Sequence, residues 1–216
     1  MGFGRIHMRI AHEGYPLIAT TGVAALIALA VGWSVLGSLL AVLTAAVAAF
    51  FRDPERAVPA GDDLIVSPAD GKVVSIAPAA AGGMFDGAAT RVSIFLSPLD
   101  VHINRVPVAG KIDAVQYQPG QFLPAYKADA WERNEQNALK ILCSGERFIG
   151  VVQIAGIMVR RIVCRAKRGD DLKRGDRFGL IMFGSRTDTY LPNGCSVEVV
   201  EGQRVKGGET IIGRFV

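Results

Sequence analysis

Hydrophobic residues are concentrated in one uninterrupted stretch near the N-terminus, from Leu17 to Phe51, which contains no charged residue. A single membrane-spanning helix needs about 20 apolar residues, so this stretch is too long for one helix and barely long enough for two. Arg5 and Arg9 precede it, and Arg52 and Arg56 follow it. Positive charge on both flanks predicts that both ends of the stretch face the cytoplasm.

The middle of this stretch carries turn-forming residues. Trp33 stands beside Gly32 and Ser34, where a tight turn would place an aromatic side chain at a membrane interface. We therefore predict that residues 1–51 form a membrane anchor, a helical hairpin that dips into one membrane. A single tilted span is the second interpretation. A cleaved signal peptide fits less well because the stretch exceeds the apolar core of such peptides, and a buried core helix fits less well because the domain is small.

The chain changes texture after Arg52, where short runs of β-branched residues alternate with Gly, Pro and Asp. Residues 71–76, 91–96 and 148–154 are such runs. Strands of this length, separated by frequent turn residues, are typical of all-β domains. We therefore predict a mainly β body over residues 52–216, a compact sandwich or barrel-like domain.

One internal repeat appears within this body. Residues 169–175 and 202–208 share the pattern G-x-x-[LV]-K-x-G, and each segment runs into an apolar strand. The pair resembles the half-repeats of biotinyl- or lipoyl-type domains, in which glycines allow the tight turns. The carrier lysine of such domains, in a Met-Lys-Met or Asp-Lys-Ala turn, is absent. A carrier function is therefore not supported.

Composition and charge narrow the classes of function. Half of the residues are hydrophobic and the mean hydropathy is +0.30, as expected for a membrane-attached chain. Cys143, Cys164 and Cys195 have no C-x-x-C spacing, which favours a reducing compartment and argues against a disulfide framework or a zinc site. The net charge of +4 comes without a basic run, so nothing indicates binding of nucleic acid. We predict no metal.

Three short segments carry the candidate chemistry: residues 67–72, 96–107 and 182–188. Each has an ordinary explanation, since Asp-Gly pairs form turns and Gly-Ser pairs form bends. Together, however, they contain Asp70, His102 and Ser185, and His102 is the only histidine after the anchor. These residues supply a carboxylate, a base and a hydroxyl, the groups that activate a serine. The sequence alone does not show that they meet in space.

Four motifs in the body identify a family. F-R-D-P at 51–54, S-P-A-D-G at 67–71, S-P-L-D-V-H-x-N-R at 97–105 and F-G-S-R at 183–186 occur in this order. Together they resemble the phosphatidylserine decarboxylases, in the short form with a hydrophobic N-terminal segment. The resemblance extends from Phe51 to the C-terminal strand. It implies decarboxylation of phosphatidylserine to phosphatidylethanolamine.

The resemblance also implies that the chain cuts itself between Gly184 and Ser185. In that family the serine hydroxyl attacks the preceding carbonyl to give an ester. β-Elimination then leaves dehydroalanine, which hydrolyses to ammonia and a pyruvoyl group. The chains 1–184 and 185–216 would remain associated. The pyruvoyl group made from Ser185 would be the cofactor, forming a Schiff base with the substrate amine and accepting the electrons released with CO2.

Roles for other residues follow from the same resemblance. Asp70 would orient or stabilise the histidine, and His102 would serve in cleavage and in protonation of the product carbon. Longer family members carry a second histidine where this chain has Arg105, and arginine is no base near neutral pH. Either His102 covers both tasks or the short form assigns the base differently. Arg105 becomes a candidate to bind a carboxylate or phosphate of the substrate.

The predicted partners are a phospholipid substrate and the bilayer that holds it. We expect the protein at the cell membrane, with the catalytic domain on the cytoplasmic side, and the resemblance is compatible with a homodimer. Three alternatives stay open: a decarboxylase of another serine-headgroup lipid such as archaetidylserine, a non-enzymatic membrane-anchored adaptor with a lipoyl-like body, and a self-processing serine peptidase. An adaptor would stay intact, and a peptidase would release a free N-terminal serine.

Overall fold

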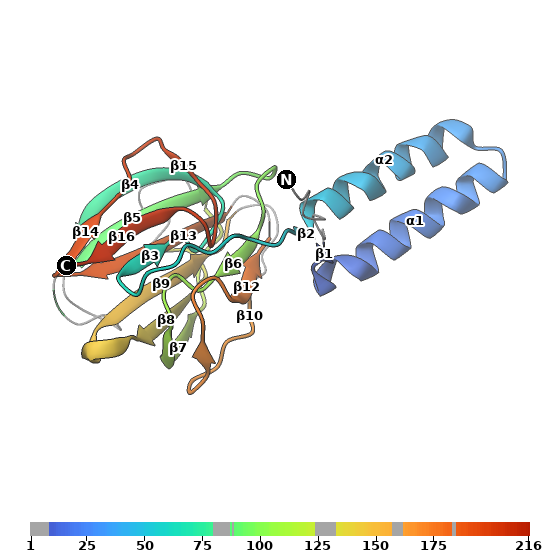
Figure 1. Ribbon diagram of the computed structural model, residues 1–216. Helices are drawn as coiled ribbons and strands as arrows, with labels where there is room; N and C mark the ends of the chain where they lie inside the picture. The colour runs from blue at the N-terminus through green and yellow to red at the C-terminus, as the bar shows by residue number, and fades with distance from the viewer. Residues whose placement is uncertain (1–8, 80–86, 88, 124–132, 157–161, 183–184) are drawn as a thin grey trace, which may run out of the picture. The chain divides into compact units, whose positions relative to one another are not determined.

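The computed structural model describes residues 9–79, 87, 89–123, 133–156, 162–182 and 185–216 (Figure 1). The chain divides into two compact units, Met1–Glu55 and Arg56–Val216. Each unit is described by itself below.

The first unit contains two apolar helices. Helix α1 spans Tyr15–Ala30 and follows the short 3-10 helix η1 (His12–Gly14), while α2 spans Ser34–Phe50. The turn between them uses Gly32 with φ +85°, a conformation that costs glycine little. Strands β1 (Arg9–Ile10) and β2 (Arg52–Asp53) pair antiparallel and close the two ends of the unit.

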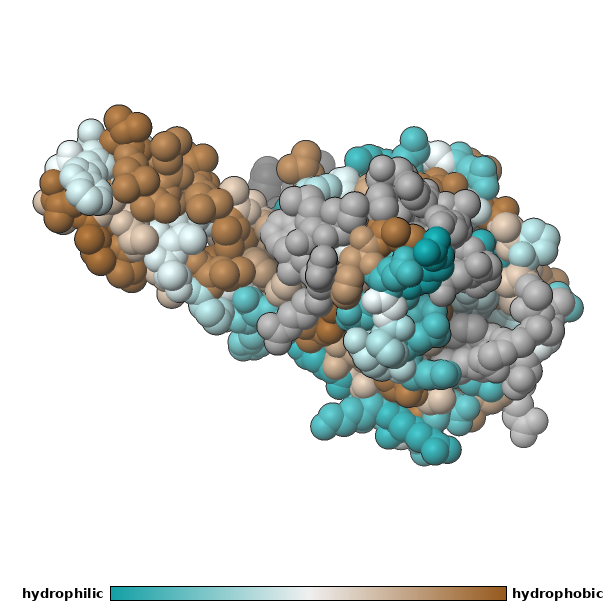
Figure 2. Space-filling model, turned by 180° about the vertical axis from the view of Figure 1, so that it is seen from behind, coloured by the Kyte–Doolittle hydropathy of each residue, from teal (hydrophilic) through white to brown (hydrophobic). Residues whose placement is uncertain are grey.

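Small residues form the contact between α1 and α2. A Cβ on Gly37 would lie 2.5 Å from Cγ of Leu29, so only glycine lets this leucine pack against α2. Large apolar side chains are exposed instead, including Leu26, Trp33 and Val35, and Figure 2 shows hydrophobic surface over much of the two helices. Within the described residues, His12–Ala30 is long and apolar enough to cross a membrane, and Ser34–Phe50 is somewhat shorter.

The second unit is built on an eight-stranded antiparallel sheet. Its strands, in spatial order, are β11 (Asp171–Leu172), β7 (Gly110–Gln118), β8 (Gln136–Leu142), β9 (Phe148–Ile154), β13 (Ser185–Pro192), β5 (Ala89–Leu96), β4 (Gly71–Ala79) and β15 (Arg204–Val205). Alternate residues of the central strands point into one apolar core, among them Ile94, Leu139 and Val151. The predicted mainly β fold class is confirmed.

Two three-stranded sheets complete this body (Figure 1). One contains β10 (Ile162–Cys164), β12 (Arg177–Ile181) and β6 (Ile103–Arg105) in that order. The other contains β14 (Cys195–Val197), β16 (Ile211–Phe215) and β3 (Leu64–Val66). A short 3-10 helix, η2 (Ser144–Glu146), lies between β8 and β9.

The body contains an internal repeat that is more extensive than the sequence pattern indicated. We call β3, β4, β14, β15 and β16 the first half-repeat and β6, β7, β10, β11 and β12 the second. In the first, Val205 pairs with Gly71 and Arg204 with Lys72. In the second, Leu172 pairs with Gly110 and Asp171 with Lys111. The two G-x-x-[LV]-K-x-G segments therefore form equivalent edge strands at the two ends of the large sheet.

The turns of the two half-repeats match in detail. Gly169 and Gly202 both have positive φ, +95° and +89°, and so do Gly175 and Gly208, +85° and +79°. The amide of Gly169 donates to Ile112 as that of Gly202 donates to Val73, each at 2.8 Å. The predicted likeness to lipoyl-type half-repeats stays a prediction.

Candidate active site

Ser185 opens β13 in the middle of the large sheet. This strand pairs with β5 along its whole length, Ser185 lying opposite Leu96, and with β9 on its other side. Ser185 is fully buried, and its Oγ makes no hydrogen bond within the described part of the chain. A buried hydroxyl left in this state is unusual, because burying it without a partner costs free energy. Gly184, the other half of the predicted cleavage site, lies outside the described residues.

The predicted cleavage site lies where the chain passes from one sheet to another. Strand β12 ends at Ile181 in a three-stranded sheet, and β13 begins at Ser185 in the eight-stranded sheet. The amide of Ile181 donates to the backbone oxygen of His102 at 3.3 Å. His102 is therefore beside the strand that leads to the cleavage site.

His102 is almost completely buried, at 1% exposure, and its ring has a defined orientation. Nδ1 lies 2.9 Å from the backbone oxygen of Asp100. A carbonyl oxygen only accepts, so Nδ1 carries the proton in this contact and Nε2 is the basic nitrogen of the neutral ring. The residue that orients the imidazole is thus Asp100, through its backbone.

Asp100 is itself held in a tight turn. The hydroxyl and amide of Ser97 donate to Oδ2 of Asp100 at 2.7 and 2.8 Å, and Arg204 donates to Oδ1 at 2.8 Å. Burial would raise the pKa of this carboxyl, but the hydrogen bonds from Ser97 and Arg204 outweigh burial and lower it. The ionised carboxylate therefore fixes the turn that carries the carbonyl beside His102.

Asp70 lies at the same end of the large sheet as Ser185, because β4 begins one residue after Asp70 and β5 ends at Leu96. Its described hydrogen bonds run to Nη2 of Arg56 at 2.7 Å and to the amide of Gly207 at 2.8 Å. Burial raises the pKa of Asp70, although the Arg56 guanidinium opposes this. The predicted contact from Asp70 to His102 is not among these bonds, and its role in orienting the ring stays a prediction.

Arg105 is also buried, with 3% exposure. Its Nη1 donates to the backbone oxygen of Gly175 at 3.0 Å, and a Cβ on Gly208 would lie 2.8 Å from its Cδ. This side chain therefore reaches the equivalent turns of both half-repeats. The sequence did not predict this structural contact, and binding of substrate by Arg105 stays a prediction.

The residues just after Ser185 fix β13 on its other face. The guanidinium of Arg186 donates to both carboxylate oxygens of Asp188, at 2.6 and 2.9 Å, and to the hydroxyl of Ser93 on β5 at 2.7 Å. All three residues are buried. Such a paired and hydrogen-bonded charge group is costly to disrupt, so it holds the start of β13 in place.

Sequence reasoning identified Asp70, His102 and Ser185 but missed their immediate partners. Arg56 was read only as a flank of the anchor, and Asp100 only as part of a motif. A signal did exist for Asp100, since Ser-Pro-x-Asp favours a turn capped by the aspartate. No signal in the sequence indicated that Arg56 would bind Asp70.

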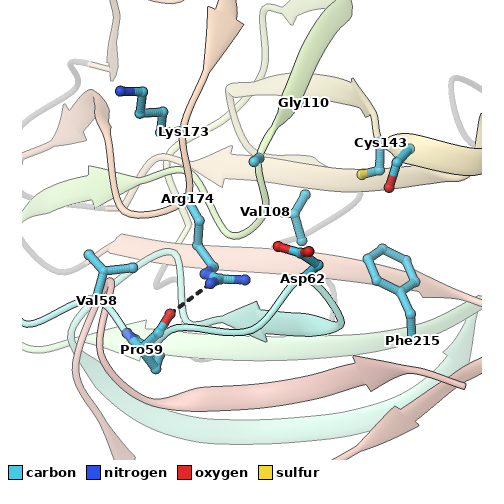
Figure 3. A pocket seen from close by; sticks show the side chains of 11 residues that line it. Val58, Pro59, Asp62, Val108, Gly110, Cys143, Lys173, Arg174 and Phe215 are labelled. Atoms are coloured by element: carbon cyan, nitrogen blue, oxygen red, sulfur yellow. Dashed lines mark hydrogen bonds between the residues drawn. The ribbon is translucent and has the colours of Figure 1, made fainter.

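A cavity of about 700 Å³ lies elsewhere in the body (Figure 3). It contains none of the predicted site residues, and Arg174 on its wall donates to the backbone oxygen of Pro59 at 2.7 Å. Cys143 also lines it, and burial raises the pKa of this thiol to about 11. The thiol is therefore protonated near neutral pH and is a poor nucleophile there.

Comparison with known proteins gives a consistent result. The family model described as phosphatidylserine decarboxylase matches residues 43–213. The phosphatidylserine decarboxylase proenzyme of Ruegeria pomeroyi is 51% identical over 183 residues, which are 83% of this chain and 84% of that protein. The protein of the same name from Symbiobacterium thermophilum is 47% identical over 206 residues, 95% of each chain. That from Syntrophus aciditrophicus is 43% identical over 209 residues, 95% and 97% of the two chains.

Proposed function

The chain belongs to the phosphatidylserine decarboxylase family, and we propose that it cuts itself before Ser185 and then decarboxylates phosphatidylserine to phosphatidylethanolamine. The observation that carries this proposal is the position of Ser185. Its hydroxyl is buried, has no hydrogen-bond partner in the described part of the chain, and stands where β12 passes into β13. It comes within a chain that matches the family over most of its length.

Self-cleavage starts from the Ser185 hydroxyl. Its oxygen attacks the carbonyl carbon of residue 184, the hydroxyl proton goes to a base, and the peptide nitrogen leaves as the amine of an ester. Loss of the Cα proton and of the ester carboxylate then gives dehydroalanine, whose hydrolysis releases ammonia. His102 is the proposed base, because the Asp100 carbonyl leaves its Nε2 as the basic nitrogen. Asp70 is proposed to assist as a carboxylate at the same end of the sheet.

The residues present fit the pyruvoyl group that the family implies. It would replace Ser185 itself, at the start of a strand paired on both sides. When present, it supplies a carbonyl that binds the substrate amine and accepts electrons as CO2 leaves. His102 then holds a proton for the product carbon, and buried surroundings exclude water. Arg105 is the proposed contact for an anionic group of the headgroup.

The two products of cleavage are proposed to stay associated. The segment 185–216 contributes β13, β14, β15 and β16, which belong to two sheets of the body. Strand β13 lies between β5 and β9 and pairs with both. Separating the chains would expose these backbone groups and the core beneath them. A homodimer stays a prediction.

The helical unit is the proposed membrane anchor. Each helix is about 25 Å long, close to the roughly 30 Å of the hydrocarbon core, so the pair could enter a bilayer and return. Its exposed apolar side chains suit lipid rather than water, and the short approach of α2 at Gly37 is typical of helices that pack in membranes. Arginines at both ends favour a body on the cytoplasmic side. An anchored body would meet its lipid substrate at high effective concentration.

Intact mass measurement tests this function directly. The purified chain is expected as two species, residues 1–184 and residues 185–216, the second lacking a free amine and lighter by one ammonia than a fragment that begins with serine. Vesicles containing phosphatidylserine should then release CO2. Ser185→Ala should stay at 23.0 kDa and be inactive, whereas Ser196→Ala, on β14 of the same fragment, should be cleaved normally. A folded, unsubstituted chain that stays intact would overturn the proposal.

A further inference from the structure

The two half-repeats contain one equivalent glycine each, Gly179 on β12 and Gly213 on β16. A Cβ on Gly179 would lie 2.1 Å from the backbone oxygen of Val163, and one on Gly213 would lie 2.6 Å from that of Ser196. Both glycines follow an irregularity in strand pairing. The backbone is thus built in the same way at both places.

The side chains that pack on these glycines differ in chemistry. In the first half-repeat Gly213 pairs with Ile65, and Cδ1 of Leu191 lies 3.1 Å from its Cβ position. In the second, Gly179 pairs with Asn104, and Nε2 of Gln153 lies 3.0 Å from its Cβ position. Two amides therefore stand where the other half-repeat has isoleucine and leucine.

These amides form a network that joins the large sheet to a three-stranded sheet. Gln153 on β9 donates from Nε2 to Oδ1 of Asn104 on β6 at 2.8 Å and approaches the oxygen of Val163 on β10 at 3.3 Å. Asn137 on β8 donates to Oε1 of Gln153 at 3.2 Å. Asn104 reaches the hydroxyl of Thr187, two residues after Ser185, at 3.5 Å. All four polar side chains are at most 4% exposed.

Stability does not explain this network. Buried amides cost free energy unless every group is paired, and an apolar pair fills the same site well. The first half-repeat shows that the fold accepts the apolar solution, Ile65 with Leu191. What differs is the strand above the glycine. Strand β16 ends the domain, whereas β12 continues directly to the predicted cleavage site and into β13.

We propose that Gln153 and Asn104 are positioning residues for self-cleavage and for the mature enzyme. Their hydrogen bonds fix the two sheets relative to one another across the junction at which the chain is cut, and so hold His102, two residues before Asn104, against residue 185. Directional hydrogen bonds define such a register better than apolar contacts do. Once the chain is cut, β12 and β13 are no longer covalently joined, and these bonds remain. The inference rests on the proposed function.

The decisive variant copies the first half-repeat into the second. Gln153→Leu combined with Asn104→Ile should fold with a melting temperature close to that of the unsubstituted chain. It should cleave itself at least about tenfold more slowly, since a shift of 1 Å in a reacting group can cost about a hundredfold in rate. In its mature fraction, kcat on phosphatidylserine vesicles should fall while KM stays unchanged, because the lipid contacts are intact.

The control reverses the relation between stability and rate. Leu191→Ala removes core volume at the equivalent apolar site and should lower the melting temperature, yet cleave at close to the normal rate. If the amides were merely structural, the less stable Leu191→Ala chain would cleave more slowly than the double variant, and the inference would be wrong.

A smaller change serves if the double variant does not fold. Thr187→Val keeps the side-chain shape but removes the hydroxyl that Asn104 reaches, and should slow cleavage, whereas Thr187→Ser keeps the hydroxyl and should restore it. Equal rates for Thr187→Val and the unsubstituted chain would overturn the inference alone. An unsubstituted chain that never cleaves would overturn the proposed function, and this inference with it.

Discussion

The two half-repeats of the body build the same turn from different residues, and the difference identifies Asp70 as a functional group. In the first, Gly71 and Lys72 pair with β15 after Asp70; in the second, Gly110 and Lys111 pair with β11 after Ala109. The backbone hydrogen bonds of the two turns correspond. Since alanine forms the turn equally well, the fold does not require a carboxylate there.

The facing loops differ in the same sense. In the first half-repeat the Gly207 amide donates to the Asp70 carboxylate. In the second, the corresponding residue is Arg174, whose guanidinium donates to the backbone oxygens of Pro59, Gly61 and Leu64. One half-repeat thus uses this position to hold a buried acid, and the other uses it to fasten a loop beside the cavity of Figure 3.

Exchanging the two residues should give the largest effect. Asp70→Ala should slow self-cleavage by about a hundredfold or more, the usual contribution of an acid–base group, while the melting temperature changes little. Ala109→Asp, its counterpart in the second half-repeat, should cleave at the normal rate. The measurement is the time course of the 185–216 fragment by mass. Normal cleavage in Asp70→Ala would make Asp70 a turn residue after all.

A pH profile sharpens the comparison further. Burial raises the pKa of Asp70 and Arg56 lowers it, so removing the guanidinium in Arg56→Gln should raise this pKa further. The carboxylate then forms only at higher pH, and the acid limb of the cleavage rate should move up by about one pH unit. Arg214→Gln, which removes an exposed ion pair with Asp63 in the same half-repeat, should leave the profile unchanged. An unshifted profile in Arg56→Gln would separate Asp70 from the chemistry.

The equivalent glycines should give the smallest effects, on stability alone. Any side chain at Gly208 or Gly175 must adopt positive φ, which costs about 1–2 kcal/mol. Gly175→Ala should cost more than Gly208→Ala, because its Cβ would lie 2.4 Å from Cγ2 of Val58, whereas the other would meet the flexible Arg105 side chain at 2.8 Å. Gly194→Ala, with φ +87° and open space around it, gives the cost of φ alone. Chemical denaturation measures all three, and equal costs at Gly175 and Gly194 would contradict the packing argument.

Much of this site could be predicted because its residues lie in local motifs. Ser185, His102 and Asp70 each occur in a short, specific pattern, and the glycines at 169, 175, 202 and 208 revealed the repeated turns because positive φ requires a residue without Cβ. The mainly β fold was predicted for a similar reason, since strand runs and turn residues alternate along the chain. The two helices followed from an uncharged stretch too long for one helix.

The remaining features depend on residues that are distant in sequence, and only the tertiary structure decided them. Arg56 meets Asp70, Gln153 meets Asn104, and the Asp100 carbonyl meets the His102 ring because of how strands pair and sheets pack, and no spacing along the chain encodes those meetings. The sequence by itself determined which chemical groups are available and which turns can form, because propensity and motif are local. Which groups face one another was decided by the packing of the core, because burial couples every strand to its neighbours at once.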